Sequence, residues 1–106
     1  MLGEEAVAEI MRTFTEDTKA NLETMNHAAS SKDLQTTYRF AHSVTGAARN
    51  VGADALAERA STLEQTVGSL SATQIAAEIA AMQSELDAVL SRLGTSIGPT
   101  VREVVR

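Results

Sequence analysis

The chain has 106 residues, a formal net charge of −5, no cysteine, no tryptophan and one proline, which fits a single, largely helical domain. Without cysteine it has neither disulfides nor thiolate metal ligands, and two histidines cannot bind zinc without a carboxylate cluster that the sequence lacks, so no metal site or cofactor is expected. The acidic charge argues against nucleic-acid binding, and the absence of a long apolar run or a basic leader argues against a membrane span, so we expect a cytoplasmic protein.

The first predicted helix covers residues 4–29. Apolar residues recur there in steps of three and four, which is the spacing of one buried stripe on a helix. The stripe consists of Val7, Met11, Phe14, Thr18, Leu22, Met25 and Ala29. Thr13 and Glu16 have the spacing of a capping box, so the segment is either one helix or a short helix followed by a longer one. His27 falls between stripe positions and should face solvent.

The second predicted helix covers residues 33–51 and begins after a Ser-Ser-Lys-Asp sequence that offers several N-caps. Its expected buried residues are Leu34, Ala41, Val44, Ala48 and Val51. Helical geometry places His42 at the rim of this apolar arc. Its neighbours on the rim are Tyr38, Thr45, Gly46 and Arg49. The ring is thus braced by the bundle while one nitrogen faces solvent, as a nucleophile that meets another protein requires.

Two further helices complete the pattern. Gly52 is expected to end the second helix, and Gly68-Ser69 to end a third that carries Leu56, Ala60, Leu63, Val67 and Leu70. A capping box of Ser71 and Gln74 starts the fourth. The fourth helix carries Ile75, Ile79, Met82, Leu86, Val89, Leu90 and Leu93, with Gly94 as its C-terminal cap.

Short connections make successive helices antiparallel neighbours. The sequence therefore predicts an all-α fold, an antiparallel up-down-up-down four-helix bundle with a short extra N-terminal helix or helix extension. We assign the bundle to residues 1–94 and a C-terminal tail or linker to residues 95–106. Pro99 could start a further turn packed on the bundle, and the sequence does not choose between that turn and a frayed linker.

The segment from Ala41 to Leu56 reads Ala-His-Ser-Val-Thr-Gly-Ala-Ala-Arg-Asn-Val-Gly-Ala-Asp-Ala-Leu. Gly46 leaves bare backbone one turn from the imidazole of His42, so that a partner protein can approach closely. Glycine inside a helix costs up to about 1 kcal/mol relative to alanine, so clearance explains Gly46 better than stability does. The pattern resembles the signature of histidine-containing phosphotransfer (HPt) domains, roughly Ala-His-x-Leu-Lys-Gly followed by a hydrophobic residue, glycine and leucine.

The resemblance extends from about Val7 to Leu93 and implies that His42 accepts a phosphoryl group and exchanges it with an aspartate of a response-regulator receiver domain. The sequence shows no phosphate loop or nucleotide site, so no autonomous kinase activity is expected. Mg²⁺ and most of the charge stabilisation would come from the receiver. The expected partners are receiver domains or a hybrid histidine kinase, and the protein is expected to be a monomer.

Basic residues gather around the histidine. The segment from Lys32 to Val51 has three basic residues and one acidic residue in a chain of net charge −5. This balance suits an acidic partner pocket, although charge alone would leave Arg39 and Arg49 as solvated residues. The residues expected to contact the partner or lie near the phosphoryl group are Tyr38, Arg39, Thr45, Gly46, Arg49 and Glu64.

Thr45 stands where the family commonly has lysine, and it carries no charge. Either Arg49 supplies the charge, or phosphohistidine is less stabilised, or the domain is degenerate and binds partners without phosphotransfer. The presence of both His42 and Gly46 argues against degeneracy. Glu64 matches a family position whose side chain lies near the histidine and could orient its inner nitrogen. The rival from another functional class is a non-catalytic helical adaptor that uses the same surface.

Overall fold

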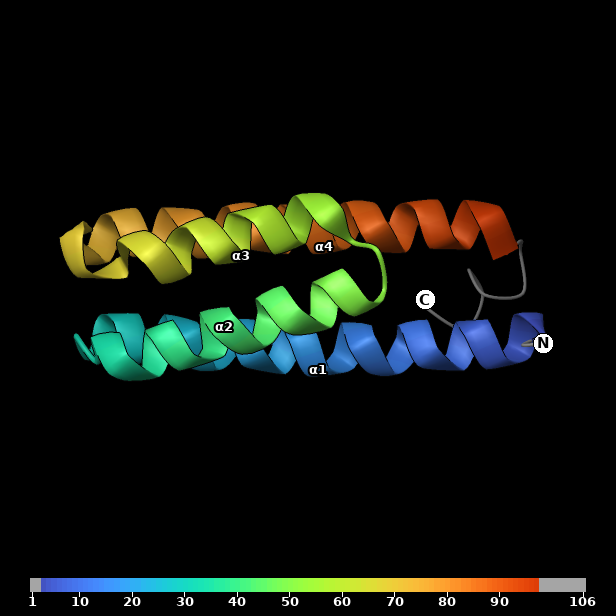
Figure 1. Cartoon of the computed structure of the whole chain (residues 1–106), viewed down its shortest axis with the longest axis horizontal. Helices are drawn as coiled ribbons and strands as arrows, with labels where there is room; N and C mark the ends of the chain where they lie inside the picture. Colours follow the sequence, from blue (N-terminus) through green and yellow to red (C-terminus); the bar gives the residue numbers. More distant parts are fainter. Residues whose placement is uncertain (1–2, 98–106) are drawn as a thin grey trace.

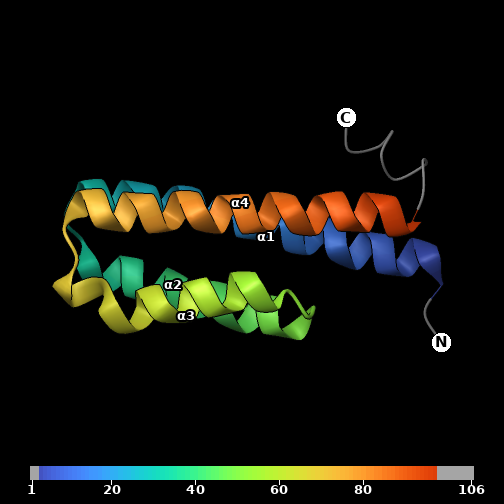
Figure 2. The ribbon, with the colours of Figure 1, turned by 90° about the horizontal axis from the view of Figure 1, so that it is seen from above.

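The structure, a computed structural model, describes residues 3–97. It consists of α1 (Glu4–Ser30), α2 (Leu34–Asn50), α3 (Asp54–Thr66), the 3₁₀ turn η1 (Val67–Ser69) and α4 (Ala72–Ile97). Successive helices are antiparallel, and α1 and α3 each lie beside both α2 and α4 (Figures 1 and 2). The predicted all-α, up-down-up-down four-helix bundle is confirmed.

The core is built from the predicted stripe of each helix. Its largest fully buried apolar side chains are Leu22, Met25, Val44, Leu56, Leu63, Ile75, Ile79, Met82 and Leu86. Leu34 was expected to join them, but it is 41% exposed. It is the first residue of α2 and lies at the end of the bundle, and Thr37, one turn later, is the first residue of this helix that is buried.

Helix α1 is uninterrupted over 27 residues, so the alternative of a short helix ending before a capping box at Thr13 and Glu16 is wrong. Thr13 lies in the middle of the helix, where backbone hydrogen bonds already satisfy the donors that a cap would satisfy. The N-terminal turns of α1 form an extension past the end of α2 (Figure 1). Val7 is 38% exposed there, in contrast to its predicted burial, because this stretch lacks the cover of α2.

The ends of α2 follow from local chemistry. The carboxylate of Asp33 accepts hydrogen bonds from the hydroxyl of Thr36 at 2.6 Å and from its backbone N–H at 3.1 Å. These bonds hold the pKa of Asp33 below its ordinary value. Gly52 follows the helix with φ 75°, a left-handed conformation that favours glycine and stops the helix as predicted.

Helix α4 begins as predicted and ends later than predicted. Ser71 and Gln74 form the capping box: the Ser71 hydroxyl accepts from the Gln74 N–H at 3.1 Å, and the Gln74 amide oxygen accepts from the Ser71 N–H at 2.8 Å. The expected cap at Gly94 is wrong, because α4 continues to Ile97. Glycine weakens a helix by about 1 kcal/mol without ending it. The predicted turn at Pro99 lies outside the described residues.

Candidate functional site

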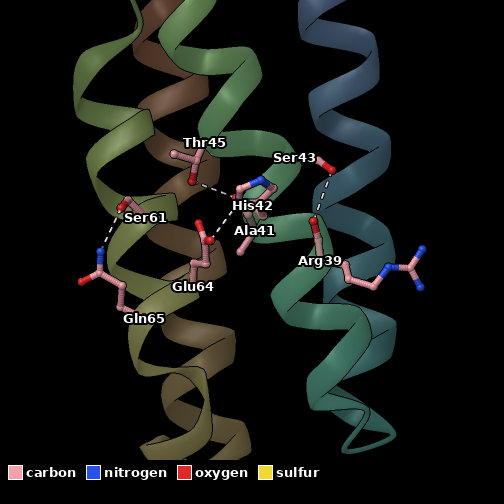
Figure 3. Close-up of polar contacts among 8 residues, drawn as sticks. All are labelled: Arg39, Ala41, His42, Ser43, Thr45, Ser61, Glu64 and Gln65. Carbon is pink, nitrogen blue, oxygen red and sulfur yellow. Dashed lines mark hydrogen bonds and ion pairs between the residues drawn. The ribbon is translucent and has the colours of Figure 1, made fainter.

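His42 lies in the middle of α2, on the side that faces α3. Its side chain is 73% exposed, and its Nδ1 lies 2.8 Å from Oε2 of Glu64 (Figure 3). A carboxylate can only accept a hydrogen bond, so Nδ1–H is the donor. In the neutral ring the lone pair is then on Nε2, the nitrogen farther from Glu64. The contact fixes both the orientation of the imidazole and the nitrogen that can act as a nucleophile.

The close packing of α2 and α3 creates this contact. Small side chains line both helices: Ala41 and Ala48 of α2, and Ala57 and Ala60 of α3, are all buried. Small residues let two helix backbones approach each other. Glu64 follows Ala60 by one turn on α3, so it emerges at the edge of the packed face, and its side chain is only 17% exposed.

Thr45 does not lie on the open rim where it was expected. It is 3% exposed, and its hydroxyl donates to the backbone oxygen of Ala41 at 2.8 Å (Figure 3). The short side chain of threonine bonds the carbonyl one turn back in its own helix in this way. Because the only side-chain donor of Thr45 is engaged, this residue supplies neither a charge nor a free hydrogen bond beside His42.

Gly46 is exposed one turn after His42. A Cβ atom built on Gly46 would have no atom within 4 Å. No contact inside the molecule therefore requires glycine at this position. The space that glycine keeps free lies outside the bundle, beside the imidazole, which supports clearance for a partner as its role.

The other predicted site residues lie around His42 at different distances. Tyr38 is 44% exposed one turn before it. Arg39 borders the same shallow hollow as Tyr38 and His42, but its guanidinium points away from the imidazole (Figure 3). Arg49 is exposed two turns beyond His42. The structure thus brings together His42, Glu64 and Gly46 and leaves Tyr38 beside them, while the guanidinium of Arg39 points away from the ring.

Leu34 is a residue of this surface that the sequence reasoning missed. It was assigned to the core, but its exposed side chain lies two turns before His42. Its spacing of eight residues from His42 was the available signal. His27, in contrast, is exposed on α1 as expected.

Within residues 3–97, no three histidine, cysteine or acidic side chains gather as a metal site would require. The same part of the chain has no helix with the length and hydropathy needed to cross a membrane. What this surface offers chemically is one exposed nitrogen nucleophile, a carboxylate that orients it, and open space beside both.

The fold and the site together define a helical bundle that presents an oriented histidine on its surface. The sequence model described as the Hpt domain matches residues 9–95, and the chain therefore belongs to the Hpt domain family. Hpt domains take part in phosphotransfer in two-component systems, where they work with receiver domains and kinases. Neither the curated proteins nor the solved structures include a match to this chain.

Proposed function

We propose that this protein accepts a phosphoryl group on Nε2 of His42 and exchanges it with the aspartate of a receiver domain. The observation that carries the proposal is the 2.8 Å contact between Nδ1 of His42 and Glu64, on a side chain that is 73% exposed. One nitrogen is held by the bundle, and the other is open to a partner. We further propose that the protein acts as a monomer in the cytoplasm, where phosphoryl groups derived from ATP are available.

In the transfer step, the Nε2 lone pair forms a bond to phosphorus while the phosphorus–oxygen bond to the receiver's aspartate breaks. The aspartate leaves as a carboxylate, and Nδ1 keeps its proton. The phosphorylated ring then carries a positive charge, which the nearby carboxylate of Glu64 stabilises. Mg²⁺ and the groups that surround the phosphoryl oxygens belong to the receiver in this proposal. The same step in reverse returns the phosphoryl group to an aspartate.

The direct test incubates the protein with a panel of receiver domains that carry labelled aspartyl phosphate. We expect at least one receiver to transfer acid-labile, base-stable label to this chain, as a phosphoramidate bond on histidine requires. A receiver that binds stably and transfers no label would instead support the rival function, a non-catalytic adaptor. Wild-type protein that neither binds nor accepts label from any receiver would contradict both functions.

Glu64 should act as a positioning residue for His42. Glu64→Ala removes the acceptor of the Nδ1 proton, and we expect labelling by a receiver to slow about tenfold, the effect of losing one partly exposed charge-assisted hydrogen bond. Glu64→Gln keeps an amide oxygen as acceptor and should retain more of the rate. Nitrogen NMR of the imidazole reports the tautomer independently of activity. Glu58→Ala, an exposed change on the same helix, is the control and should alter neither the rate nor the spectrum.

Arg49 should assist the encounter and not the chemical step. It lies seven residues beyond His42, about 10 Å along the helix axis, so it reaches the partner more readily than the phosphoryl group. Arg49→Ala should lower the efficiency of transfer about threefold at low salt, and the difference should disappear as salt shortens the Debye length below about 8 Å. Lys19→Ala on α1 removes an equal charge elsewhere and should leave the rate unchanged.

Thr45→Lys tests the missing family charge in the same assay. Because Thr45 is buried, an introduced lysine must extend outward past the ring of His42, and this path brings its ammonium group near the phosphoryl oxygens. Because a charge beside the phosphoryl oxygens favours the chemical step, we expect Thr45→Lys to offset part of the overall rate that Arg49→Ala loses through a slower encounter. Equal rates for Arg49→Ala and wild type at low salt would show that Arg49 does not assist the encounter.

A further inference from the structure

Among residues 3–92, whose side chains the structure describes, four large apolar side chains are exposed: Val7, Ile10, Leu34 and Tyr38. Leu34 and Tyr38 are on α2, 41% and 44% exposed, two turns and one turn before His42. Spacings of four and eight residues place them on one side of the helix with His42. Isolated exposed apolar residues are ordinary on protein surfaces. Two that lie in line with the reactive side chain on one helix indicate a surface that a partner covers.

The geometry of helices and interfaces indicates which partner covers them. Each residue adds about 1.5 Å to an α-helix, so Tyr38 lies about 6 Å and Leu34 about 12 Å from His42 along the axis. A standard interface covers about 800 Å² on each partner, which corresponds to a disc with a radius of about 16 Å. A receiver centred on His42 therefore covers both side chains.

The two halves of the α2 surface differ in chemistry. Before His42 it presents Leu34 and Tyr38, with Lys32 and Arg39 exposed nearby. After Gly46 the exposed residues are Arg49 and Asn50, and no large apolar side chain is exposed there. Next to Glu64 on α3, Gln65 donates to the hydroxyl of Ser61 at 3.4 Å, so the α3 side is polar as well (Figure 3). A bound receiver meets an apolar contact on one side of His42 only.

We propose that Leu34 and Tyr38 are specificity-determining residues, which select a receiver whose surface beside the phosphorylated aspartate carries an apolar patch with an acidic edge. The acidic edge is complementary to Lys32 and Arg39, and the apolar patch buries Leu34 and Tyr38. This inference rests on the proposed phosphotransfer function. It adds two points to that function. The receiver binds with its apolar patch toward the turn between α1 and α2, and Leu34 and Tyr38 determine which receivers bind.

The experiment measures transfer from a phosphorylated receiver to Leu34→Ala, Tyr38→Ala and the double variant. Each single change should raise the KM for the receiver about tenfold, as truncation of an interface hot spot does, and high salt should not remove the difference. Phosphoramidate is a donor too small to contact either side chain. The rate of labelling by phosphoramidate should therefore change far less than the KM for the receiver does. Val7→Ala and Ile10→Ala truncate equally exposed side chains in the first two turns of α1, and they should leave the KM unchanged. Tyr38→Phe should keep the KM close to that of the wild type.

Three results would overturn the inference. The KM values of the α2 variants could match those of the Val7 and Ile10 controls. The variants could lose labelling by phosphoramidate to the same degree as labelling by the receiver, which would place their effect on His42 itself. The wild type could be a dimer that Tyr38→Ala dissociates at unchanged KM, which would assign the surface to a second copy. Failure of the proposed function is distinguishable, because wild-type protein would then accept label from no receiver.

Discussion

His42→Gln is expected to abolish phosphorylation by every receiver while the bundle stays folded. Glutamine has no nitrogen lone pair that can attack phosphorus, so the loss should be complete. Its amide N–H groups can still donate to Glu64, and the replaced side chain is 73% exposed, so little packing is lost. The measurement is acid-labile label after incubation with a phosphorylated receiver, together with thermal unfolding followed by circular dichroism.

His27→Gln is the matched control, because it makes the same change at the other histidine of the chain. His27 is exposed near the end of α1, and among the described residues no ion pair joins its ring to a carboxylate as Glu64 is joined to His42. We expect this variant to be labelled as fully as the wild type. Persistent label on His42→Gln, or loss of label on His27→Gln, would show that His42 is not the phosphoacceptor.

The bundle could be predicted from the sequence because burial follows helical periodicity. Met25, Leu63 and Met82 occupy stripe positions on three helices, and all three are fully buried. The end of α2 could also be predicted, since Gly52 adopts a conformation that other residues avoid. In these cases a local pattern is sufficient, and no knowledge of the other helices is needed.

The sequence-based predictions of burial fail where the burial of a residue depends on whether a neighbouring helix covers it. Val7 and Leu34 fit the apolar stripes of their helices, but both lie where no neighbouring helix covers them. The periodicity of a helix does not show how far the neighbouring helices extend along it. Thr45 shows the reverse case, a residue assigned to the rim that the neighbouring helix buries. Gly94 directly follows the last predicted stripe residue, which is the position of a C-terminal cap, but the helix continues past it to Ile97.

The contact between His42 and Glu64 joins residues 22 positions apart. It depends on the register of α3 against α2, which the buried alanines of both helices set. The spacing of the two residues in the sequence contains no periodicity that predicts this register. The family resemblance suggested that Glu64 lies near His42. The structure gives the physical reason for the contact, because the carboxylate lies at the edge of the packed face and the imidazole faces it.

Substitutions at Gly46 should separate stability from phosphotransfer. Gly46→Ala places a methyl group where no atom lies within 4 Å, and alanine favours the helix by up to about 1 kcal/mol, so the melting temperature should hold or rise. Gly46→Leu should also fold, since the added side chain extends into open space. In both variants, His42 and Glu64 should keep their contact.

Transfer from a receiver should nevertheless fall progressively from Gly46→Ala to Gly46→Leu. The leucine side chain occupies the space through which the partner approaches His42, and a displacement of about 1 Å from the reactive geometry can slow a reaction about a hundredfold. Labelling by phosphoramidate should decline much less, because that donor needs little room. Ala76→Leu adds the same bulk at an exposed position on α4 and should transfer normally. If Gly46→Leu accepts label from a receiver at the wild-type rate, the open space beside His42 is not the path of the partner, and another reason must explain a glycine inside this helix.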